Sequence, residues 1–390
     1  MRIKIAILLP LLAVVFFSCV PSSEYLKEST VPKETKKETQ TLRILLMKTS
    51  DSVKISSQKH ISITESETGK VLLNSDKGLT VNFSPEKVNR NLIIESDNAE
   101  LSVNGTAYRG SILLSNQSKS LFVINEVSMR DYLISVVPSE IIPSWDMESL
   151  KAQSVASRTY AVYNISKKTK ETYDLDSNTN SQMYKGIASE NPRTTQAVND
   201  TANIILVHDS QPIEAFFHST CGGRTIDAKY VWSSGDIPYL HSAKCEYCKE
   251  SNHYTWETHL SVLQIRQALS KRYNGIGKIQ NIVFKKKEGR VISASVKHSN
   301  GIINLTGNQF RLWIDPKTIK SLYFNSALQT DGLKLSGKGW GHGVGLCQWG
   351  SKGMADLGWT YDKILKYYYP NTQLNKNSLL NSNSFGSAGR

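Results

Sequence analysis

Short apolar runs alternate with turn residues from residue 41 to about residue 125. Segments such as LRILLM, HISIT, LTVNF and LFVINEV are separated by clusters of Asp, Asn, Gly and Ser. Alternation of this length, bounded by turn residues, predicts antiparallel strands joined by hairpins. No constellation of catalytic side chains stands out, so we interpret residues 41–125 as a β-rich N-terminal domain that serves as a spacer or binding module.

The pattern changes after residue 126, where VPSEIIPSWDMESLKAQSVASRTYAVYN occupies residues 137–164. A strand-like run turns through two prolines and continues as a helix from about Trp145 to Asn164. Ser144 is the expected N-cap, and Asp146 lies in the first turn, where the helix dipole favours acids. Abundant Ala and Ser predict a central, largely buried helix. Glu140 lies in the turn before it.

One face of this helix is expected to carry Lys151, Ser154 and Arg158, because they are spaced three to four residues apart. The face is either solvated or in contact with a ligand. Further along, short strands, loops and a glycine-rich segment, GWGHGVGLCQWG, precede an amphipathic helix. We therefore predict an α+β fold, with a mixed domain of antiparallel strands and a central buried helix over 126–372 and a disordered tail over 373–390.

The first 19 residues, MRIKIAILLPLLAVVFFSC, combine a basic start with an apolar run that ends at Cys19. This composition predicts a signal peptide over 1–19 and acylation of Cys19, with a flexible tether over 20–40. The protein would then be a lipoprotein held on a membrane outside the cytoplasm. The alternative is a secreted protein with an incidental cysteine.

The net charge is +13. A basic chain favours polyanionic partners such as anionic lipid or an acidic cell-wall polymer. No basic segment interleaved with aromatics forms a nucleic-acid-binding module, so we expect no nucleic-acid partner.

Three long stretches resemble the SpoIID/LytB family, in the family's order and over about residues 126–372. They are residues 131–164, the NSQMYKG segment with FFHSTCGGRTIDAKYVWSSGDIPYLHS, and residues 337–374. The resemblance implies action on peptidoglycan glycan strands, as a lytic transglycosylase that cleaves the MurNAc–GlcNAc β-1,4 bond and leaves a 1,6-anhydro end. The family's catalytic glutamate follows a serine, which places it at Glu140 after Ser139. Ile141 and Ile142 stand where the family has Met-Pro.

A single carboxylate suffices for this chemistry, because the C6 hydroxyl of the sugar replaces water as the nucleophile. Apolar neighbours of Glu140 should raise its pKa and keep the acid protonated. The alternative from the residues alone is that Glu140 only caps a helix or forms an ion pair. The family's Q-x-Y-x-G motif matches Gln182 and Tyr184, which we expect to line the substrate groove.

Further substrate contacts are expected from Ser139, Arg158, His342 and Gln348. A core histidine in a glycine-shaped turn is the alternative for His342. Relatives described as amidase enhancers provide the alternative function: a non-catalytic peptidoglycan-binding protein that partners a wall amidase.

His218, Cys221, Cys245 and Cys248 form a candidate Cys₃His zinc site. Four ligands of these types suit a closed, structural zinc, and some family members hold zinc in this part of the domain. The alternatives are a disulfide from Cys221 to Cys245 or Cys248, or free thiols. We do not interpret Cys347 as a nucleophile.

Overall fold

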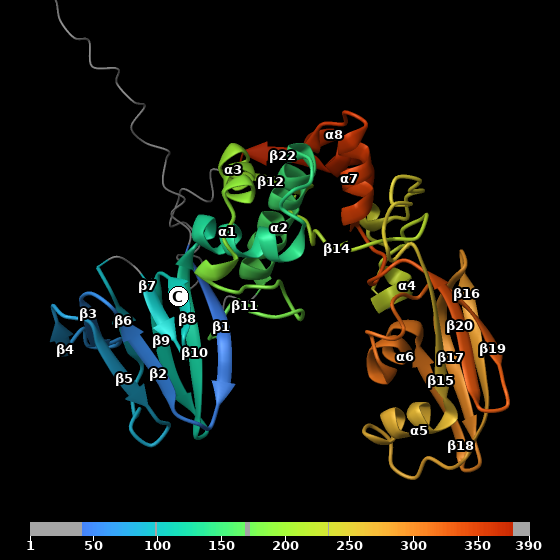
Figure 1. Ribbon diagram of the computed structural model, residues 1–390, viewed down its shortest axis with the longest axis horizontal. Helices are drawn as coiled ribbons and strands as arrows, with labels where there is room; N and C mark the ends of the chain where they lie inside the picture. The colour runs from blue at the N-terminus through green and yellow to red at the C-terminus, as the bar shows by residue number, and fades with distance from the viewer. Residues whose placement is uncertain (1–40, 98–99, 168–171, 233, 377–390) are drawn as a thin grey trace, which may run out of the picture. The chain divides into compact units, whose positions relative to one another are not determined.

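The computed structural model describes residues 41–97, 100–167, 172–232 and 234–376 (Figure 1). The predicted signal peptide, the acylated Cys19 and the tether over 20–40 lie outside the described residues, as does the chain from 377 onward. No helix within the described ranges is both long enough and apolar enough to cross a membrane.

The N-terminal region is built of strands, which confirms the β-rich prediction. They are β1 (Thr41–Thr49), β2 (Val53–Ser57), β3 (Ile61–Glu65), β4 (Val71–Ser75), β5 (Leu79–Phe83), β6 (Leu92–Glu95), β7 (Glu100–Val103), β8 (Thr106–Arg109), β9 (Ser111–Gln117) and β10 (Ser120–Ser128). One sheet has the order β1-β10-β9-β6-β3-β4, with the short strand β11 (Leu175–Asp176) beside β1, and the other has the order β5-β2-β7-β8. Alternate residues such as Ile55, Ile94 and Leu121 are fully buried between the sheets, as period-two patterning requires.

Helix α1 (Met129–Glu140) replaces the strand-like run that the sequence predicted before Glu140. Its β-branched residues favour strands locally. The Ser128 side chain nevertheless accepts a hydrogen bond from Asp131 N–H and starts a helix. Tyr132, Val136 and Val137 are then buried in the core beneath it. Burial of this face therefore outweighs the local strand preference.

Helix α2 (Met147–Lys167) confirms the predicted central helix, which is buried over most of its length. Its cap is Asp146 and not Ser144, because Asp146 Oδ1 accepts a hydrogen bond from Glu148 N–H at 2.8 Å. The helix therefore begins two residues later than the sequence suggested.

The remaining elements around α2 form several short sheets and helices. They are β11 (Leu175–Asp176), η1 (Ile187–Ser189), α3 (Pro192–Asp200), β12 (Ile204–His208), β13 (Gln211–Pro212), β14 (Phe217–His218), α4 (Lys229–Trp232), η2 (Pro238–Leu240), β21 (Leu346–Cys347), α7 (Gln348–Asp356), α8 (Tyr361–Tyr368) and β22 (Gln373–Lys376). Strand β22 pairs with β12. The predicted disordered tail is thus ordered over its first four residues.

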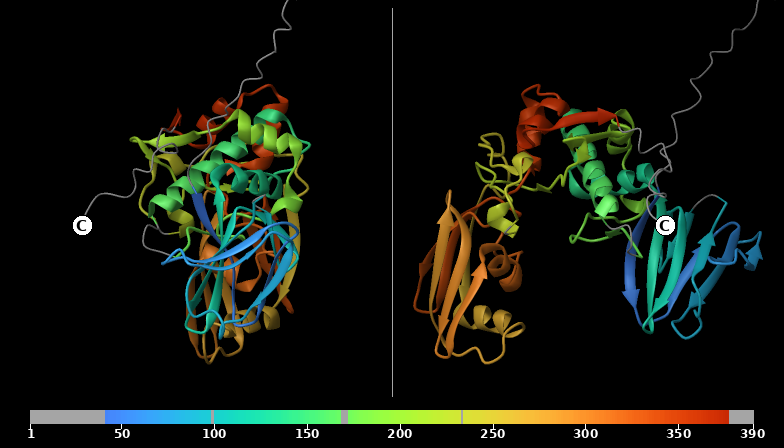
Figure 2. Two further views of the ribbon diagram at one scale, coloured as in Figure 1. Left: turned by 90° about the vertical axis from the view of Figure 1, so that its left-hand side faces the viewer. Right: turned by 180° about the vertical axis from the view of Figure 1, so that it is seen from behind.

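Residues 255–338 form a separate group of elements with its own hydrophobic core, which includes Trp256, Phe310 and Leu335. We call it the inserted region. It consists of β15 (Thr255–Ser261), α5 (Val262–Ser270), β16 (Ile279–Lys287), β17 (Arg290–His298), β18 (Gly301–Thr306), α6 (Gly307–Ile314), β19 (Phe324–Leu328) and β20 (Gly332–Lys338). Figures 1 and 2 show α5 and α6 on one side of its strands.

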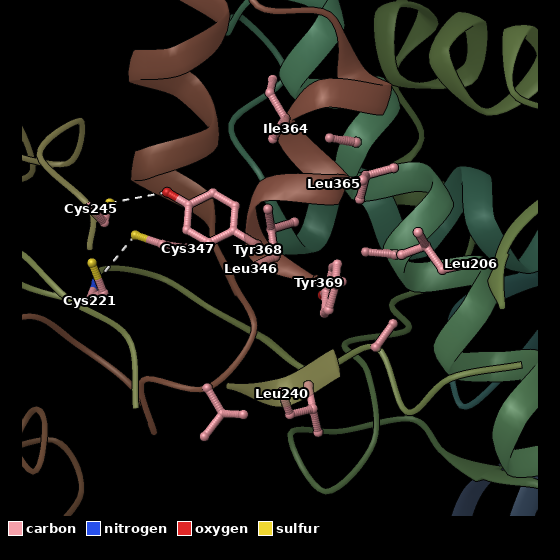
Figure 3. Packing of buried hydrophobic residues seen from close by; sticks show 14 of the residues in the cluster. Leu206, Cys221, Leu240, Cys245, Leu346, Cys347, Ile364, Leu365, Tyr368 and Tyr369 are labelled. Atoms are coloured by element: carbon pink, nitrogen blue, oxygen red, sulfur yellow. Dashed lines mark hydrogen bonds between the residues drawn. The ribbon is translucent and has the colours of Figure 1, made fainter. Parts of the chain in front are cut away.

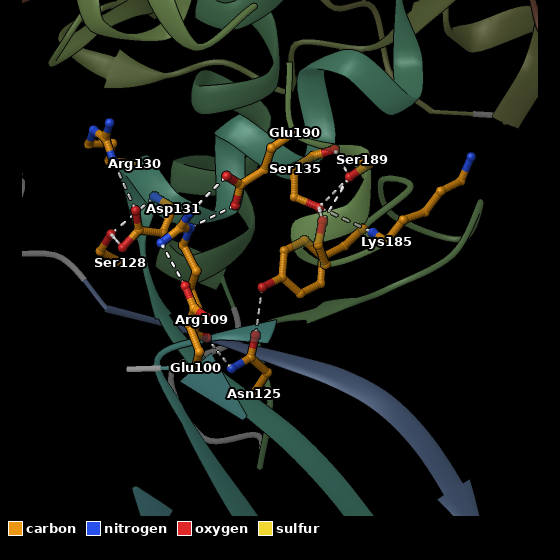
Figure 4. Close-up of polar contacts among 12 residues, drawn as sticks. Glu100, Arg109, Asn125, Ser128, Arg130, Asp131, Ser135, Lys185, Ser189 and Glu190 are labelled. Atoms are coloured by element: carbon orange, nitrogen blue, oxygen red, sulfur yellow. Dashed lines mark hydrogen bonds and ion pairs between the residues drawn. The ribbon is translucent and has the colours of Figure 1, made fainter. Parts of the chain in front are cut away.

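Polar contacts join the N-terminal strands to the helical part. Arg109 of β8 donates from Nε and Nη2 to the two carboxylate oxygens of Glu190, at 2.7 and 2.9 Å (Figure 4). Asn125 of β10 accepts a hydrogen bond from the Tyr184 hydroxyl at 2.6 Å. The N-terminal strands are thereby linked to the segment that carries the Q-x-Y-x-G motif.

Candidate functional site

Glu140 is the last residue of α1 and is half-buried. Its Oε1 accepts a hydrogen bond from Met183 N–H at 2.8 Å. The main chain of the Q-x-Y-x-G segment therefore fixes one carboxyl oxygen. No described donor contacts the other oxygen, which remains available to hold a proton.

Burial raises the pKa of the Glu140 carboxyl above its usual value. The Met183 hydrogen bond and the charge of Lys185 oppose this shift, but the net direction is upward. The structure therefore bears out the expected environment: a carboxyl that is protonated over a wider pH range than an exposed glutamate.

Gln348 holds the main chain at this position. Its Nε2 donates to the carbonyl oxygen of Glu140 at 2.9 Å and to Gln153 Oε1 at 3.3 Å. The next residue, Trp349, packs edge-on against Trp145 with ring centroids 4.9 Å apart. The N-terminus of α7 thus supports the end of α1. The Gln348 side chain binds the main chain of Glu140, which differs from the contact to sugar that the sequence predicted.

Arg158 does not provide the expected substrate contact, because its side chain is fully buried. Its guanidinium donates to the carbonyl oxygens of Ile204 and Val198, at 3.2 and 3.1 Å. These carbonyls lie 40 and 46 residues further along the chain, so the spacing of residues on α2 alone does not reveal this role.

Gln182 and Tyr184 are buried beneath the site and do not line an open groove. Gln182 Oε1 accepts a hydrogen bond from the Tyr132 hydroxyl at 3.0 Å, while Tyr184 bonds to Asn125. Their motif matters here because it presents Met183 N–H to Glu140. Ser139, which is half-buried, donates to the Ser135 carbonyl at 2.9 Å.

Both ring nitrogens of His342 are engaged by the main chain. Nε2 donates to Phe217 O at 2.9 Å, and Nδ1 accepts from Val344 N–H at 3.1 Å. Burial lowers the pKa of His342 to about 3, so the ring is neutral near pH 7. The alternative interpretation, a histidine satisfied inside a glycine-shaped turn, describes this arrangement.

Four cysteines gather in a buried cluster: Cys221, Cys245, Cys248 and Cys347, whose sulfur atoms all lie within 4.8 Å of one another. Figure 3 shows three of them, Cys221, Cys245 and Cys347. All four are free thiols, so the alternative disulfide is not formed. Cys221 Sγ and Cys248 Sγ are 3.5 Å apart. A tetrahedral tetrathiolate metal site with metal–sulfur bonds of about 2.3 Å has sulfurs about 3.8 Å apart. The cluster can therefore hold a metal ion.

His218 is not part of this cluster, which corrects the expected Cys₃His set. Its Nδ1 donates to Val344 O at 3.1 Å, and its ring packs against His342. Cys347 takes the fourth place because β21 pairs in parallel with β14, opposite His218. The paired positions are 129 residues apart. Sequence motifs of closely spaced metal ligands, such as C-x-x-C, cannot predict a ligand that distant.

Main-chain and hydroxyl groups surround the sulfurs. Cys347 Sγ accepts from Cys221 N–H at 3.2 Å and from Gly350 N–H at 3.3 Å. The Tyr368 hydroxyl lies 3.0 Å from Cys245 Sγ. Burial raises the pKa of the Cys221 and Cys347 thiols, so a nearby cation is needed before all four can ionise together.

A buried cation does lie beside the cluster. Arg290 is 1% exposed, and its Nη2 donates to the carbonyl oxygens of Cys221 and Arg224 at 2.5 and 2.6 Å. No carboxylate of the described chain pairs with it. Since buried charges require compensation, an unpaired arginine favours an anionic neighbour, and the cysteine cluster is the adjacent candidate. Sequence reasoning missed both Arg290 and Cys347.

The N-terminus of α7 contributes to both sites, since Gln348 bonds to Glu140 and the neighbouring Cys347 belongs to the cysteine cluster. The molecule is thus an α+β protein with a half-buried carboxyl at a helix end and a cluster of four thiols. Comparison with known sequences gives the family. Residues 117–208, which include Glu140 and the Q-x-Y-x-G segment, match the model described as Stage II sporulation protein, SpoIID. The chain belongs to the SpoIID family. Residues 240–345 match a domain of unknown function, DUF8618.

Three relatives illustrate the range of the family. An uncharacterized protein of Brachyspira hyodysenteriae is 34% identical over 68% of this chain and 72% of its own length. Stage II sporulation protein D of Bacillus subtilis is 30% identical over 65% of this chain and 76% of its own length. The amidase enhancer of Bacillus subtilis is 31% identical over 62% of this chain but only 40% of its own length.

Proposed function

We propose that this protein is a peptidoglycan lytic transglycosylase that cleaves the MurNAc–GlcNAc β-1,4 bond of glycan strands during cell-wall remodelling. The observation that carries the proposal is Glu140, a half-buried carboxyl with a raised pKa and one oxygen fixed by Met183 N–H. The membership of the chain in the SpoIID family supports a function at the cell wall.

The proposed mechanism uses one carboxyl twice. Protonated Glu140 donates its proton to the glycosidic oxygen as the bond from C1 to that oxygen breaks. The resulting carboxylate then takes the proton of the C6 hydroxyl of the same MurNAc, whose oxygen bonds to C1. The product carries a 1,6-anhydro ring, Glu140 is protonated again, and no water is consumed. An intramolecular nucleophile of this kind has an effective molarity of order 10⁵ M or more.

The protonation of Glu140 fits this use. Hydrolytic glycosidases place two carboxylates on either side of the scissile bond. The anhydro-forming reaction needs only one carboxyl, because the C6 hydroxyl of the substrate replaces water. Burial favours the protonated form with which Glu140 would start that reaction.

The test compares the wild-type protein with Glu140→Gln on peptide-free glycan strands and on intact sacculi. We expect 1,6-anhydro ends, detected by mass spectrometry, from wild type and at least about 10²-fold fewer from the variant. Glu67→Gln, which neutralises an exposed glutamate of the N-terminal region, is the matched control and should behave as wild type.

The second candidate function is a non-catalytic enhancer of a wall amidase, which the likeness to the amidase enhancer favours. In that case neither form would produce anhydro ends, although both would co-sediment with sacculi. A purified amidase added to the same sacculi would then release peptide faster with the protein present. Stimulation that survives Glu140→Gln, without anhydro products, supports the enhancer.

For the cysteine cluster we propose a structural zinc held by Cys221, Cys245, Cys248 and Cys347. Four protein ligands leave no open coordination position, so the ion would brace the fold and take no part in glycan cleavage. Metal analysis of the purified protein should find one zinc per chain. Cys347→Ser should lower this content sharply, whereas His218→Gln should keep it. The reverse pattern would restore the Cys₃His set.

The lipoprotein form also remains a proposal. Mass spectrometry of membrane-extracted protein should find an N-terminus at a diacylglycerol-modified Cys19. Cys19→Ser should leave the chain without the lipid. An unmodified, secreted wild-type chain would contradict this proposal.

A further inference from the structure

The inserted region carries most of the protein's net charge. Residues 255–338 contain fourteen Lys and Arg against four Asp and Glu, which gives +10 of the +13 of the whole chain. Only Lys334 among these fourteen forms an ion pair in the described structure, with Glu257 at 3.3 Å. A region of 84 residues thus presents a strong and largely uncompensated positive field.

The same region exposes apolar side chains. Ten large apolar residues are exposed in the described part of the chain, and five of them lie here: Leu263, Val283, Ile302, Leu312 and Leu328. Val283 is 57% and Ile302 62% exposed. Exposed apolar side chains next to unpaired lysines are characteristic of surfaces that bind another phase or partner.

Strand register places two of these apolar residues and two lysines on one face. Val283 pairs with Ser295, and Lys285 with Ser293. Lys297 pairs with Ile302 across β17 and β18. Directly paired residues point to the same side of a sheet, and alternation along β16 and β17 brings all four side chains to that side. We call this surface the docking face.

The docking face is open and free of acids. The residues between the lysines and the aliphatics are small or neutral: Asn281, Ser293, Ser295, Asn304 and Thr306. Helix α6 covers the opposite side of β17 and β18, where Ala294, Val296 and Leu305 are buried (Figures 1 and 2). The sheet therefore has one side in the core and one side toward solvent.

We infer that the docking face of the inserted region binds an anionic phospholipid membrane. Lysines are attracted to the negative headgroups, while Val283 and Ile302 enter the boundary between headgroups and acyl chains. An anionic polysaccharide fits the charge but leaves the two aliphatics without an apolar partner. The face extends over three strands, which suits a lipid surface better than one extended glycan chain.

The test measures co-sedimentation of the full chain with phosphatidylcholine vesicles, with and without phosphatidylglycerol, at about 0.1 M salt. Any lipid anchor at the N-terminus is shared by all variants, so the difference between the two vesicle types reports the charged face. Wild type should bind the anionic vesicles more tightly. Lys285→Gln with Lys297→Gln should weaken that binding at least about tenfold.

Two matched variants separate the face from general properties of the chain. Lys54→Gln with Lys77→Gln removes two exposed charges from the N-terminal strands, and Val71→Thr with Leu72→Thr removes two exposed aliphatics there. Both should bind as wild type. Val283→Thr with Ile302→Thr should still bind anionic vesicles at low salt, where the lysines dominate. Its binding at higher salt should be weaker than that of wild type, because the apolar contribution is lost.

Equal binding to neutral and anionic vesicles, or an equal loss from the Lys54 and Lys77 pair, would overturn the inference. The inference would also be overturned if the Lys285 and Lys297 variant sedimented normally with vesicles but no longer with glycan strands, because the face would then bind polysaccharide. Melting temperatures within a few degrees of wild type confirm that each variant is folded. The result is independent of whether Glu140 cleaves glycan.

Discussion

The Glu140 carboxyl is subject to opposing influences: burial raises its pKa, while Met183 N–H and Lys185 lower it. Because the net shift is upward, the folded protein holds this proton more tightly than the unfolded chain. At a pH below the unfolded value both states are protonated, and the full stability is present. Stability is then lost as the pH rises through the raised folded pKa.

Glu140→Gln should therefore stabilise the protein at neutral pH, by about 1.4 kcal/mol for each unit by which the pKa is raised. The gain should shrink towards zero at pH 4, where wild type is neutral too. Urea unfolding of both proteins at several pH values measures this difference. Parallel stability curves across the whole range would show that Glu140 titrates as an ordinary surface acid.

We interpret Gln348 as a positioning residue, because its side chain is buried and holds the carbonyl of Glu140. Gln348→Met keeps similar volume but leaves that carbonyl and Gln153 without a donor. We expect about 1–3 kcal/mol of lost stability and, since small displacements of a catalytic group are costly, a kcat at least about tenfold lower with KM little changed.

The measurement is glycan cleavage rate against substrate concentration, with thermal unfolding in parallel. Gln348→Glu provides the control, since at low pH its protonated carboxyl can again donate to the carbonyl. Recovery of kcat at low pH in that variant supports positioning. A loss confined to KM would instead assign Gln348 to sugar binding.

At the scale of residues, the sequence predicted Glu140 but not the roles around it. The resemblance to the family predicted Glu140 as the acid and singled out the segment of Gln182 and Tyr184, which contacts it through Met183. It could not show that these two side chains point inward, with Met183 N–H as the contact, because side-chain direction depends on how the segment packs on α1. The substrate contact predicted for Arg158 was wrong, because its side chain is buried and binds the carbonyls of Ile204 and Val198.

Among the elements, α2 and the hairpins of residues 41–125 followed from periodicity, whereas α1 did not. Ile134, Val136 and Val137 have strand-like preferences, and only their burial in the core favours the helix. The place of Cys347, the N-cap of α7, in the cysteine cluster was also not predicted, because the β14–β21 pairing brings it to the other three cysteines.

Gly350 in the first turn of α7 offers a test of that junction. A Cβ there would collide with the Tyr368 hydroxyl and lie 2.8 Å from Cys245 Sγ. Gly350→Ala should displace Cys245, lower the zinc content and destabilise the protein by about 1–3 kcal/mol. Gly235→Ala, where a Cβ meets no atom within 4 Å, is the matched control.

Metal analysis and thermal unfolding of both alanine variants measure these effects. Normal zinc content in Gly350→Ala would place the ion away from the Cys245 sulfur. A chelator should lower the melting temperature of wild type and of Gly235→Ala alike, and should have less effect on Gly350→Ala.

On the scale of the whole molecule, the sequence predicted one mixed domain over 126–372, and the inserted region within it has a hydrophobic core of its own. Periodicity identified the strands of β16, β17 and β18 and helix α5. It could not assign them to a core of their own, because hydrophobic patterning shows which face is buried and not what buries it. The sequence analysis used the net positive charge of the whole chain, but it did not recognise that most of this charge lies in the inserted region.

Arg290 connects the inserted region to the cysteine cluster, since it begins β17 and donates to Cys221 O and Arg224 O beside the cluster. Arg290→Met keeps the apolar stem but removes the charge and both hydrogen bonds. We expect a loss of about 2–4 kcal/mol in stability and weaker zinc retention, because four thiolates with one zinc carry a net negative charge that Arg290 offsets.

Arg290→Lys separates charge from geometry: it should retain most of the zinc affinity while losing one of the two carbonyl contacts. Zinc transfer to a chromogenic chelator, followed over time in each protein, measures the retention. Equal transfer rates in wild type and Arg290→Met would mean that the arginine only joins the inserted region to the neighbouring chain. A faster rate in Arg290→Met than in Arg290→Lys would show that its charge stabilises the thiolate cluster.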